Sequence, residues 1–363
     1  MIGICNLAGS SVYEGKNSNS DEIIGVMNLL KSQGLDCRIL QNEKEPPAKP
    51  QGLFGGRSKP VESFYYSDPN KFDQIIIMNG SINCFGGVVP ADTVYLFKFL
   101  KKTNAKLYYF FNDSLLKATQ LSKVLKSKTF EDVKPEDVHI DKPITVISSF
   151  KDLDFARKEN SKEWTVDNVV YFDSGKMVLY GDYKSKMVPN KGLFDFIYGG
   201  SARRDVRIKS FNEFFCSSLK TALYGNLKIE KLNNYKGEKF AKVKCTEVIA
   251  KNAEGKSTCI MQEKHYNDGF VTRRVYESMM ADCIVFFEDA FDSKHTISPF
   301  PEVYIRNRKD LETNYAKIFG DAELKNKILN WQHEFLEKVA SSDMGKELAD
   351  CLQTNLIKEK LQW

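Results

Sequence analysis

The stretch of this chain best equipped for chemistry runs from Met261 to Asp282. It holds two adjacent arginines, Arg273 and Arg274, and Glu277 follows three residues later in an apolar spacing that predicts a helix. Side chains at that spacing lie on one face, so Arg274 and Glu277 could act together on a ligand with an anionic part and a hydroxyl-bearing part. A sugar nucleotide is such a ligand. The simpler interpretation is an ion pair on the surface.

A second candidate site combines a strand, a glycine turn and a helix. The sequence FDFIYGG predicts a strand that enters a Gly-Gly-Ser turn, and residues 201–216 predict a helix whose first turns carry Arg203, Arg204 and Arg207. Backbone N–H groups and the positive end of a helix bind phosphate, and guanidinium groups add charge-assisted hydrogen bonds. A solvated basic helix end would carry the same residues.

An aspartate stands where a strand is expected to end. The run KLYYFF (106–111) predicts a buried strand, and Asn112 and Asp113 follow it directly. In open parallel sheets, ligands bind beyond the carboxyl ends of the strands. Asp113 is therefore well placed for chemistry, although it could equally be the N-cap of a helix.

Composition excludes few classes of protein. The 363 residues predict about two domains, and 28% charged with 42% hydrophobic residues is typical of a globular protein. A net charge of +5 neither requires nor excludes a nucleic-acid partner. Eight scattered cysteines without a CxxC motif predict buried free thiols in a reducing compartment and no zinc site. We expect no signal peptide, no membrane span and a cytoplasmic location.

The elements that must position these groups alternate between strands and helices. In the first half, strands are predicted at 1–7, 37–40, 72–79, 106–111, 144–150 and 168–172, and helices at 21–33, with Ser20 as N-cap, and at 91–102. Residues 41–70 are rich in Pro, Gly and Lys, which predicts a long loop, either a tolerated insertion or a basic flap that touches a polyanion. The absence of GxGxxG argues against NAD.

After a linker at 175–192, the α/β pattern starts afresh. Strands are predicted at 194–200, 220–225, 257–262, 283–289 and 303–305, and residues 310–363 are mostly helical. The sequence thus predicts two α/β halves. The cleft between them would receive Asp113 from the first half and the arginines with Glu277 from the second.

Several segments also carry a family resemblance. They are NGSINCFGG (79–87), KLYYFFND (106–113), DFIYGGSARRDVR (195–207), LYGN (223–226) and KHYNDGFVTRRVYESMMADCIVFFEDAFDSKH (264–295). These segments resemble the T-even bacteriophage DNA β-glucosyltransferase family, and the similarity is colinear over nearly the whole chain. The resemblance implies the GT-B architecture, two Rossmann-like α/β domains facing across a cleft. Residues 1–176, joined by the C-terminal helix 345–363, would bind the acceptor DNA, and residues 177–344 the UDP-sugar.

The resemblance also implies an activity. Such an enzyme transfers a sugar, glucose by default, from a UDP-sugar to the hydroxymethyl group of 5-hydroxymethylcytosine in double-stranded DNA, with inversion. Mg²⁺ or Mn²⁺ can help product release without being obligatory, and no metal-ligating residues are implied. We expect a monomer with no membrane partner, in the cytoplasm of an infected bacterial host.

Roles are implied residue by residue. Asp113 matches the catalytic base and Glu22 the acid near the sugar. Several residues are implied to bind the nucleotide sugar. Gly200 and Ser201 match a phosphate-binding turn, and Arg203, Arg207 and Arg274 match the arginines on the diphosphate. Glu277 matches the residue on the ribose, Tyr266 lies in the same stretch of sequence, and Val243 stands where a main-chain group contacts uracil.

This chemistry agrees with the residue types. A hydroxymethyl oxygen is a poor nucleophile until a carboxylate accepts its proton, which suits Asp113, and arginines stabilise the departing diphosphate. The target base must leave the DNA stack. Asn83 and Phe85 are candidates for filling the gap, although Phe85 could instead be a core aromatic.

One departure from the family pattern concerns the sugar. Glu263 stands where the family has Asp, and its extra methylene could shorten the pocket enough to favour a pentose donor such as UDP-arabinose. The extended 41–70 loop leaves open whether the acceptor already carries a sugar. The alternatives are a GT-B transferase acting on a small molecule or glycan and, less well supported, a DNA-binding protein without catalysis, which would have no use for Asp113 and Glu22 together with the arginines.

Overall fold

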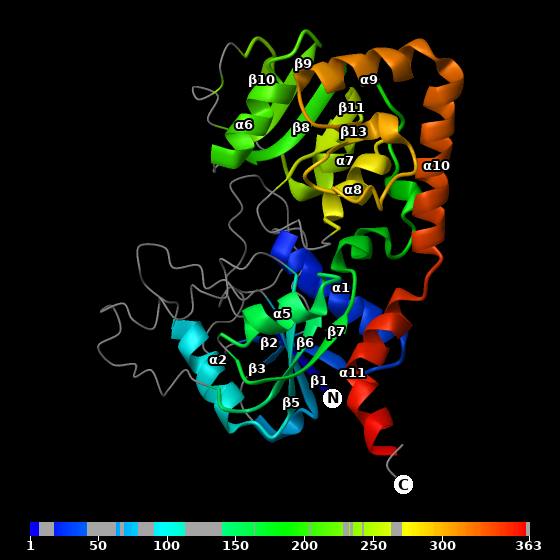
Figure 1. Ribbon diagram of the computed structural model, residues 1–363. Helices are drawn as coiled ribbons and strands as arrows, with labels where there is room; N and C mark the ends of the chain where they lie inside the picture. Colours follow the sequence, from blue (N-terminus) through cyan, green and yellow to red (C-terminus); the bar gives the residue numbers. More distant parts are fainter. Residues whose placement is uncertain are drawn as a thin grey trace. The chain divides into compact units, whose positions relative to one another are not determined.

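The computed structural model divides the chain into two compact units (Figure 1). It describes residues 1–6, 18–41, 63–65, 69–78, 91–112, 140–162, 164–202, 205–227, 232, 235–241, 243–262 and 271–360. The first unit comprises Met1–Met177 with Asp343–Trp363, and the second comprises Val178–Ser342. The assignment of DNA to the first and UDP-sugar to the second stays a prediction.

The first unit contains a seven-stranded sheet in the order β3-β2-β1-β4-β5-β6-β7, with every neighbouring pair parallel. Its strands are β1 (Ile2–Asn6), β2 (Cys37–Gln41), β3 (Ser63–Tyr65), β4 (Gln74–Met78), β5 (Lys106–Phe111), β6 (Ile144–Ser148) and β7 (Val166–Tyr171). Its helices are α1 (Ser18–Ser32), α2 (Ala91–Lys102), α5 (Leu153–Asn160), α11 (Met344–Lys360) and the 3-10 helix η1 (Pro69–Lys71), while the 3-10 helix η2 (Ser174–Leu179) spans the boundary to the second unit. Continuous apolar runs such as KLYYFF form these strands because both faces of a parallel sheet are buried.

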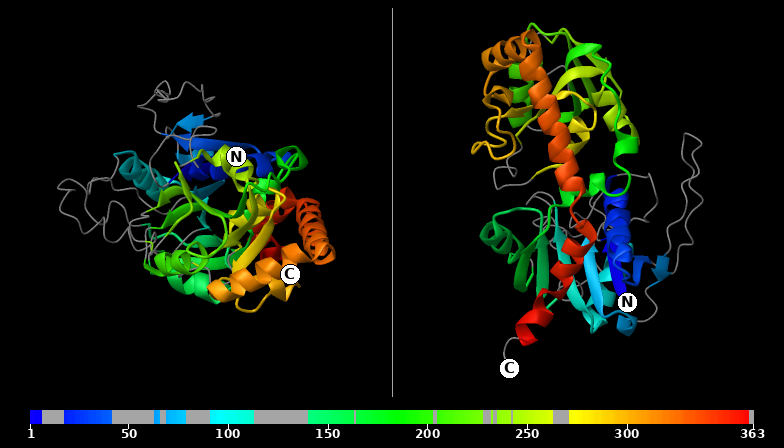
Figure 2. Two further views of the ribbon diagram at one scale, coloured as in Figure 1. Left: turned by 90° about the horizontal axis from the view of Figure 1, so that it is seen from above. Right: turned by 90° about the vertical axis from the view of Figure 1, so that its right-hand side faces the viewer.

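Helix α11 brings the end of the chain back to the first unit. It lies beside α1, and both ends of the chain belong to this unit (Figure 2). The Tyr108 hydroxyl donates to the Leu352 carbonyl at 2.5 Å, Lys176 pairs with Glu347, and Gln33 donates to Asp343 at 3.1 Å. The helix is therefore held to the sheet and to α1 by polar contacts as well as by packing.

The second unit contains a six-stranded sheet in the order β10-β9-β8-β11-β12-β13, again parallel throughout. Its strands are β8 (Phe194–Ala202), β9 (Thr221–Leu227), β10 (Glu238–Phe240), β11 (Gly255–Ile260), β12 (Ile284–Glu288) and β13 (Tyr304–Ile305). Its helices are α6 (Asp205–Phe214), α7 (Val248–Asn252), α8 (Arg273–Met279), α9 (Arg308–Gly320), α10 (Ala322–Ala340) and the 3-10 helices η3 (Lys184–Lys186), η5 (Cys245–Glu247) and η7 (Pro301–Val303).

Both sheets follow the Rossmann strand order. In each sheet the order reverses at the first strand of the unit, between β1 and β4 and between β8 and β11. Ligands of such sheets bind beyond the carboxyl ends of the strands at this reversal. The α/β fold class is therefore confirmed, and these two strand ends are the places to look for sites.

Most predicted strands lie close to their predicted bounds, but several local predictions were wrong. Helix α1 begins at Ser18, so Ser20 lies inside it and is not the N-cap. A short strand, β3, lies within the predicted 41–70 loop, where it pairs with β2. Helix α5 lies between the predicted strands 144–150 and 168–172, where no helix was predicted, and it begins where the Asp152 side chain accepts from the Phe155 N–H at 2.9 Å.

The largest correction concerns the Gly-Gly-Ser segment. It is not a turn, because β8 continues through Gly199 and Gly200 to Ala202 and pairs with β9 from Phe196 to Ala202. Ser201 belongs to this strand, helix α6 is described from Asp205, and Arg203 and Arg204 lie outside the described residues. The glycines serve close approach here rather than reversal of the chain.

Six cysteines are free thiols: Cys5, Cys37, Cys259, Cys283 and Cys351, which are buried, and Cys216, which is partly exposed. Burial raises the pKa of Cys37 to about 11, which keeps it a thiol at neutral pH. No helix within the described ranges is long and apolar enough to cross a membrane.

The close approach of Gly225 in β9 to Gly200 in β8 generates a prediction about stability. Gly225 has φ +120°, and a Cβ there would stand 2.1 Å from the Gly200 carbonyl oxygen. Gly225→Ala should therefore lower the free energy of unfolding by about 3 kcal/mol or more, because backbone strain and overlap add. Gly320→Ala is the control, since a Cβ there meets nothing within 4 Å. Calorimetric unfolding of both variants checks this, and equal Tm values would contradict it.

Candidate functional site

The second unit gathers several of the predicted site residues at the carboxyl end of β8. Arg274 donates through Nη1 to the Tyr198 hydroxyl at 2.5 Å, and its guanidinium carbon lies 5.5 Å from the centre of the Tyr198 ring. A Cβ on Gly200 would stand 2.8 Å from the same Nη1 atom. The guanidinium group thus passes directly over the Gly200 backbone, at the strand end where the sheet order reverses.

Neighbouring Gly199 makes room for a second ring. A Cβ there would stand 1.9 Å from Cζ of Tyr224, which is buried and donates its hydroxyl hydrogen to Asn252 at 2.7 Å. Burial raises the pKa of Tyr224 above its usual range, Arg274 opposes that shift, and Glu277 adds to it. The charges of Arg274 and Glu277 therefore act on one small region around the end of β8.

Glu277 is buried, with 6% of its surface exposed. Arg273 donates through Nε to its Oε1 at 2.5 Å, four residues apart on α8. The sequence paired Glu277 with Arg274, whereas the ion pair described here involves Arg273. Because Glu277 is buried, the simpler interpretation as an ion pair on the surface was wrong. A buried carboxylate must be paired or hydrogen-bonded to offset the loss of water.

Arg207 lies in the first turns of α6 and is 4% exposed. Ser210, one turn later, donates to Glu288 Oε1 at 2.7 Å, and the backbone N–H of Gln262 donates to the other oxygen of Glu288 at 2.6 Å. Burial raises the pKa of Glu288 above its usual value, while these two donors, Arg207 and Lys209 partly offset the rise. Glu288 therefore joins α6 to the end of β11.

Val243, expected near the uracil, is partly exposed and packs against the cluster of Phe194, Ile197, Ala222 and Tyr224. That cluster includes Tyr224, whose ring touches Gly199. Its predicted role stays a prediction, as do those of Gly200, Arg207, Arg274 and Glu277.

In the first unit, the structure brings Glu22 to the end of β5. Asn112 donates through Nδ2 to Glu22 Oε2 at 2.6 Å, although the residues are far apart in the sequence. Asn112 directly precedes Asp113, the predicted base. The start of α1 and the carboxyl end of β5 are thus neighbours, and the roles predicted for Glu22 and Asp113 stay predictions.

The remaining predicted site residues lie outside the described residues: Asp113, Arg203, Glu263, Tyr266, Asn83 and Phe85. Ser201 is described as part of β8. Within the described ranges, no three His, Cys, Asp or Glu side chains are grouped to hold a metal ion.

Sequence reasoning missed Tyr198, Tyr224 and Glu288. The two tyrosines stand inside apolar strand runs, where an aromatic is expected to be core. Glu288 had a usable signal, since an acid ends the buried run CIVFFE just as Asn112 and Asp113 follow KLYYFF. The same reasoning at strand ends would have found it.

Two parallel sheets in the Rossmann order, together with the match to solved structures, assign the chain to the GT-B fold of glycosyltransferases. Residues 1–181 match the family described as bacteriophage T4 beta-glucosyltransferase. The DNA beta-glucosyltransferase of Enterobacteria phage T4 is 30% identical over 349 residues, which cover 93% of this chain and 94% of the relative. The chain therefore belongs to the T4 β-glucosyltransferase family.

Solved structures of the T4 enzyme also match this chain over nearly its whole length. The T4 phage enzyme with its UDP-glucose substrate is 25% identical with a TM-score of 0.78, and its complex with UDP and Mn²⁺ is 27% identical with a TM-score of 0.77; each covers 97% of this chain and 98% of its own. An α-glucosyltransferase in complex with UDP and a 13-mer DNA is 12% identical with a TM-score of 0.58, over 97% of this chain and 99% of its own. That last likeness shows the fold alone.

The contact between Asn112 and Glu22 generates a second prediction. Asn112→Asp places another carboxylate against Glu22, so it should lower the free energy of unfolding by about 1 to 3 kcal/mol at pH 7. The loss should shrink near pH 4, where carboxylates begin to protonate. Thermal unfolding at both values measures it, with Asn112→Ala as the control that removes the amide without adding charge. A loss that is the same at both pH values would contradict the repulsion.

Proposed function

We propose that this chain transfers a sugar, glucose by default, from a UDP-sugar to the hydroxymethyl group of 5-hydroxymethylcytosine in double-stranded DNA, with inversion at the anomeric carbon. The observation that carries the proposal is the Arg274 guanidinium fixed over Gly200 at the strand reversal of the second unit. Membership of a family whose T4 relative is a DNA beta-glucosyltransferase supports the acceptor.

The donor half follows from charge and backbone. Arg274 and Arg207 supply positive charge where a diphosphate develops negative charge as the sugar leaves, and Arg203 would join them. Tyr198 and Gly200 fix Arg274 before the ligand arrives, so little reorganisation is needed during the reaction. Glu277 would accept hydrogen bonds from the ribose hydroxyls, with Tyr266 in the adjoining loop and Val243 at the uracil.

The acceptor half follows from two carboxylates. Asp113 would accept the proton of the hydroxymethyl group, whose oxygen then displaces UDP from the opposite face of the sugar. Asn112 holds Glu22 beside that strand end, where it would contact the sugar. Because the cytosine must leave the duplex to reach Asp113, Asn83 and Phe85 would fill its place.

Mg²⁺ or Mn²⁺ would assist departure of UDP, as the T4 complex with UDP and Mn²⁺ suggests, without being required. We further propose that the protein acts as a monomer in the cytoplasm of the infected host.

The identity of the transferred sugar depends on Glu263, which stands where the family has Asp. UDP-glucose is the substrate of the T4 enzyme, whereas a longer acid in the sugar pocket would favour the smaller UDP-arabinose. A protein acting on a small molecule or glycan would use the same donor half. The acceptor and the sugar must therefore be tested separately.

The decisive assay incubates DNA duplexes containing 5-hydroxymethylcytosine with UDP-glucose or UDP-arabinose and weighs the nucleosides by mass spectrometry. We expect a hexose increment from UDP-glucose. Arg274→Ala should lower kcat/KM by about 100-fold, since a charge-assisted contact to the diphosphate is lost. Arg306→Ala is the matched control, because Arg306 is an exposed arginine of the same unit that pairs with Asp310 four residues away.

A pentose increment alone would replace glucose by a pentose in the proposal. No transfer to hydroxymethylated DNA, with hydrolysis or transfer to a small acceptor instead, would contradict the DNA acceptor.

A further inference from the structure

Glu288 occupies a position in the second unit that the proposed reaction does not yet use. Its two carboxylate oxygens each accept one hydrogen bond, from the Ser210 hydroxyl at 2.7 Å and from the Gln262 backbone N–H at 2.6 Å. Ser210 belongs to α6 and Gln262 follows β11, whereas Glu288 ends β12. One carboxylate thus joins three elements at the carboxyl edge of the sheet.

Both donors lie next to residues expected to bind the donor substrate. Arg207 precedes Ser210 by one helical turn, so the two side chains rise from the same side of α6. The Arg207 charge lies close enough to Glu288 to lower the pKa of that carboxyl. Gln262 directly precedes Glu263, the residue expected at the sugar. Glu288 is therefore bonded both to the helix that carries Arg207 and to the residue that precedes Glu263 in the sequence.

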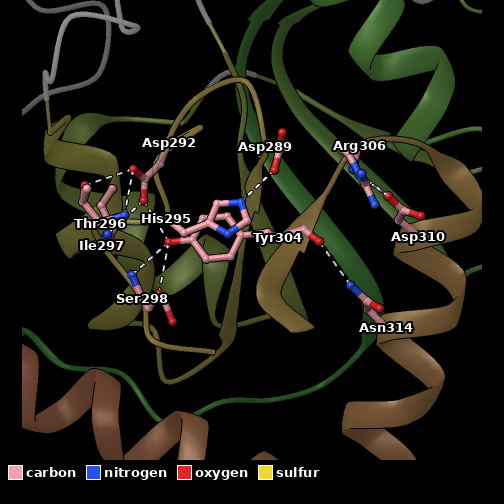
Figure 3. Close-up of polar contacts among 10 residues, drawn as sticks. All are labelled: Asp289, Asp292, His295, Thr296, Ile297, Ser298, Tyr304, Arg306, Asp310 and Asn314. Atoms are coloured by element: carbon pink, nitrogen blue, oxygen red, sulfur yellow. Dashed lines mark hydrogen bonds and ion pairs between the residues drawn. The ribbon is translucent and has the colours of Figure 1, made fainter. Parts of the chain in front are cut away.

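The backbone after Glu288 is held in place by its own network (Figure 3). The Asp292 carboxylate accepts from the N–H groups of Thr296 and Ile297 and from the Tyr304 hydroxyl, at 3.0, 2.8 and 2.8 Å. The Phe291 N–H donates to the Glu288 carbonyl at 2.7 Å. A fixed backbone on this side leaves the Glu288 side chain little freedom, which a group that aligns other residues requires.

His295 strengthens this support. Its ring stacks on Tyr304 with centroids 3.8 Å apart, and its Nε2 lies 2.7 Å from Asp289 Oδ1 (Figure 3). The Asp289 N–H donates to the Ile305 carbonyl at 2.9 Å, so the residue after Glu288 is bonded to β13. The end of β12 is thus fixed by contacts that do not involve α6 or Gln262.

Burial of this carboxylate has a cost. Desolvation raises the pKa of Glu288, and the two hydrogen bonds with the charges of Arg207 and Lys209 offset only part of that rise. An apolar residue would end the strand without this penalty. The penalty is understandable if the carboxylate aligns α6 and Gln262 for a ligand.

We propose that Glu288 is a positioning residue of the donor site, which sets α6 with Arg207 against Gln262 so that diphosphate and sugar are bound in one register. The inference rests on the proposed function, since it assumes that the second unit binds a UDP-sugar. Glu288 itself does not touch the donor. Its effect is therefore on donor binding, while the acceptor side is left as it is.

The test compares UDP binding and steady-state kinetics in matched variants. Glu288→Gln keeps the shape and one acceptor oxygen but replaces the other by an amide that cannot accept from Ser210 or Gln262. We expect the dissociation constant for UDP and the KM for UDP-glucose to rise by about 10-fold, the change expected for loss of one hydrogen bond to a charged group. We also expect kcat to change less than threefold and the KM for DNA to stay the same.

Ser210→Ala removes only the α6 bond and should raise the same constants by about threefold; it keeps the proposal testable should Glu288→Gln fail to fold. Glu302→Gln is the control, because Glu302 is another partly buried carboxylate of this unit, paired with Lys317. It should lower Tm and leave UDP binding unchanged.

The outcomes separate the two proposals. Wild-type protein that binds no UDP would overturn the proposed function and this inference with it. Wild-type protein that binds UDP, with variants at 288 and 210 that bind it equally well, would overturn only the positioning role. A fall in kcat or a rise in the KM for DNA, with UDP affinity unchanged, would likewise overturn it.

Discussion

The site depends on the absence of side chains at the end of β8. Tyr224 occupies the space beside Gly199, and the Arg274 guanidinium occupies the space over Gly200. A larger residue at Gly199 would displace the Tyr224 ring, and one at Gly200 would displace the Arg274 guanidinium. Two consecutive glycines inside a strand cost conformational entropy, and here that cost permits an arginine to approach the backbone closely where the sheet order reverses.

In both units a side chain at the end of a strand is hydrogen-bonded to a neighbouring helix. A polar residue at a strand end reaches a side chain of a helix: Asn112 bonds Glu22 of α1, and Glu288 bonds Ser210 of α6. Because parallel strands all end at one edge, such bonds place groups from distant parts of the sequence together. The functional residues can then lie on adjoining loops while their positions are set by the sheet.

The sequence predicted the α/β class because long apolar runs such as QIIIM and KLYYFF specify strands buried on both faces. It misjudged the Gly-Gly-Ser segment, since glycine pairs usually mark turns and nothing local reveals that β9 pairs as far as Ala202. It chose Arg274 over Arg273 as the partner of Glu277 because spacings of three and four are both compatible with a helix. Tyr198 could not be singled out, since its role depends on tertiary contact with Arg274. The family resemblance, by contrast, was confirmed, because it rested on many colinear segments rather than on one motif.

The most direct test of the account is hydrogen exchange of the whole protein with and without UDP, followed peptide by peptide with mass spectrometry. Placement of the nucleotide at the strand reversal of the second unit predicts slower exchange at the end of β8 (Tyr198–Ala202), in the first turns of α6 and in α8. Strands β4 to β6 of the first unit should be unaffected, and Arg274→Ala should abolish the protection. Protection confined to the first unit, or absent from the end of β8, would contradict the account.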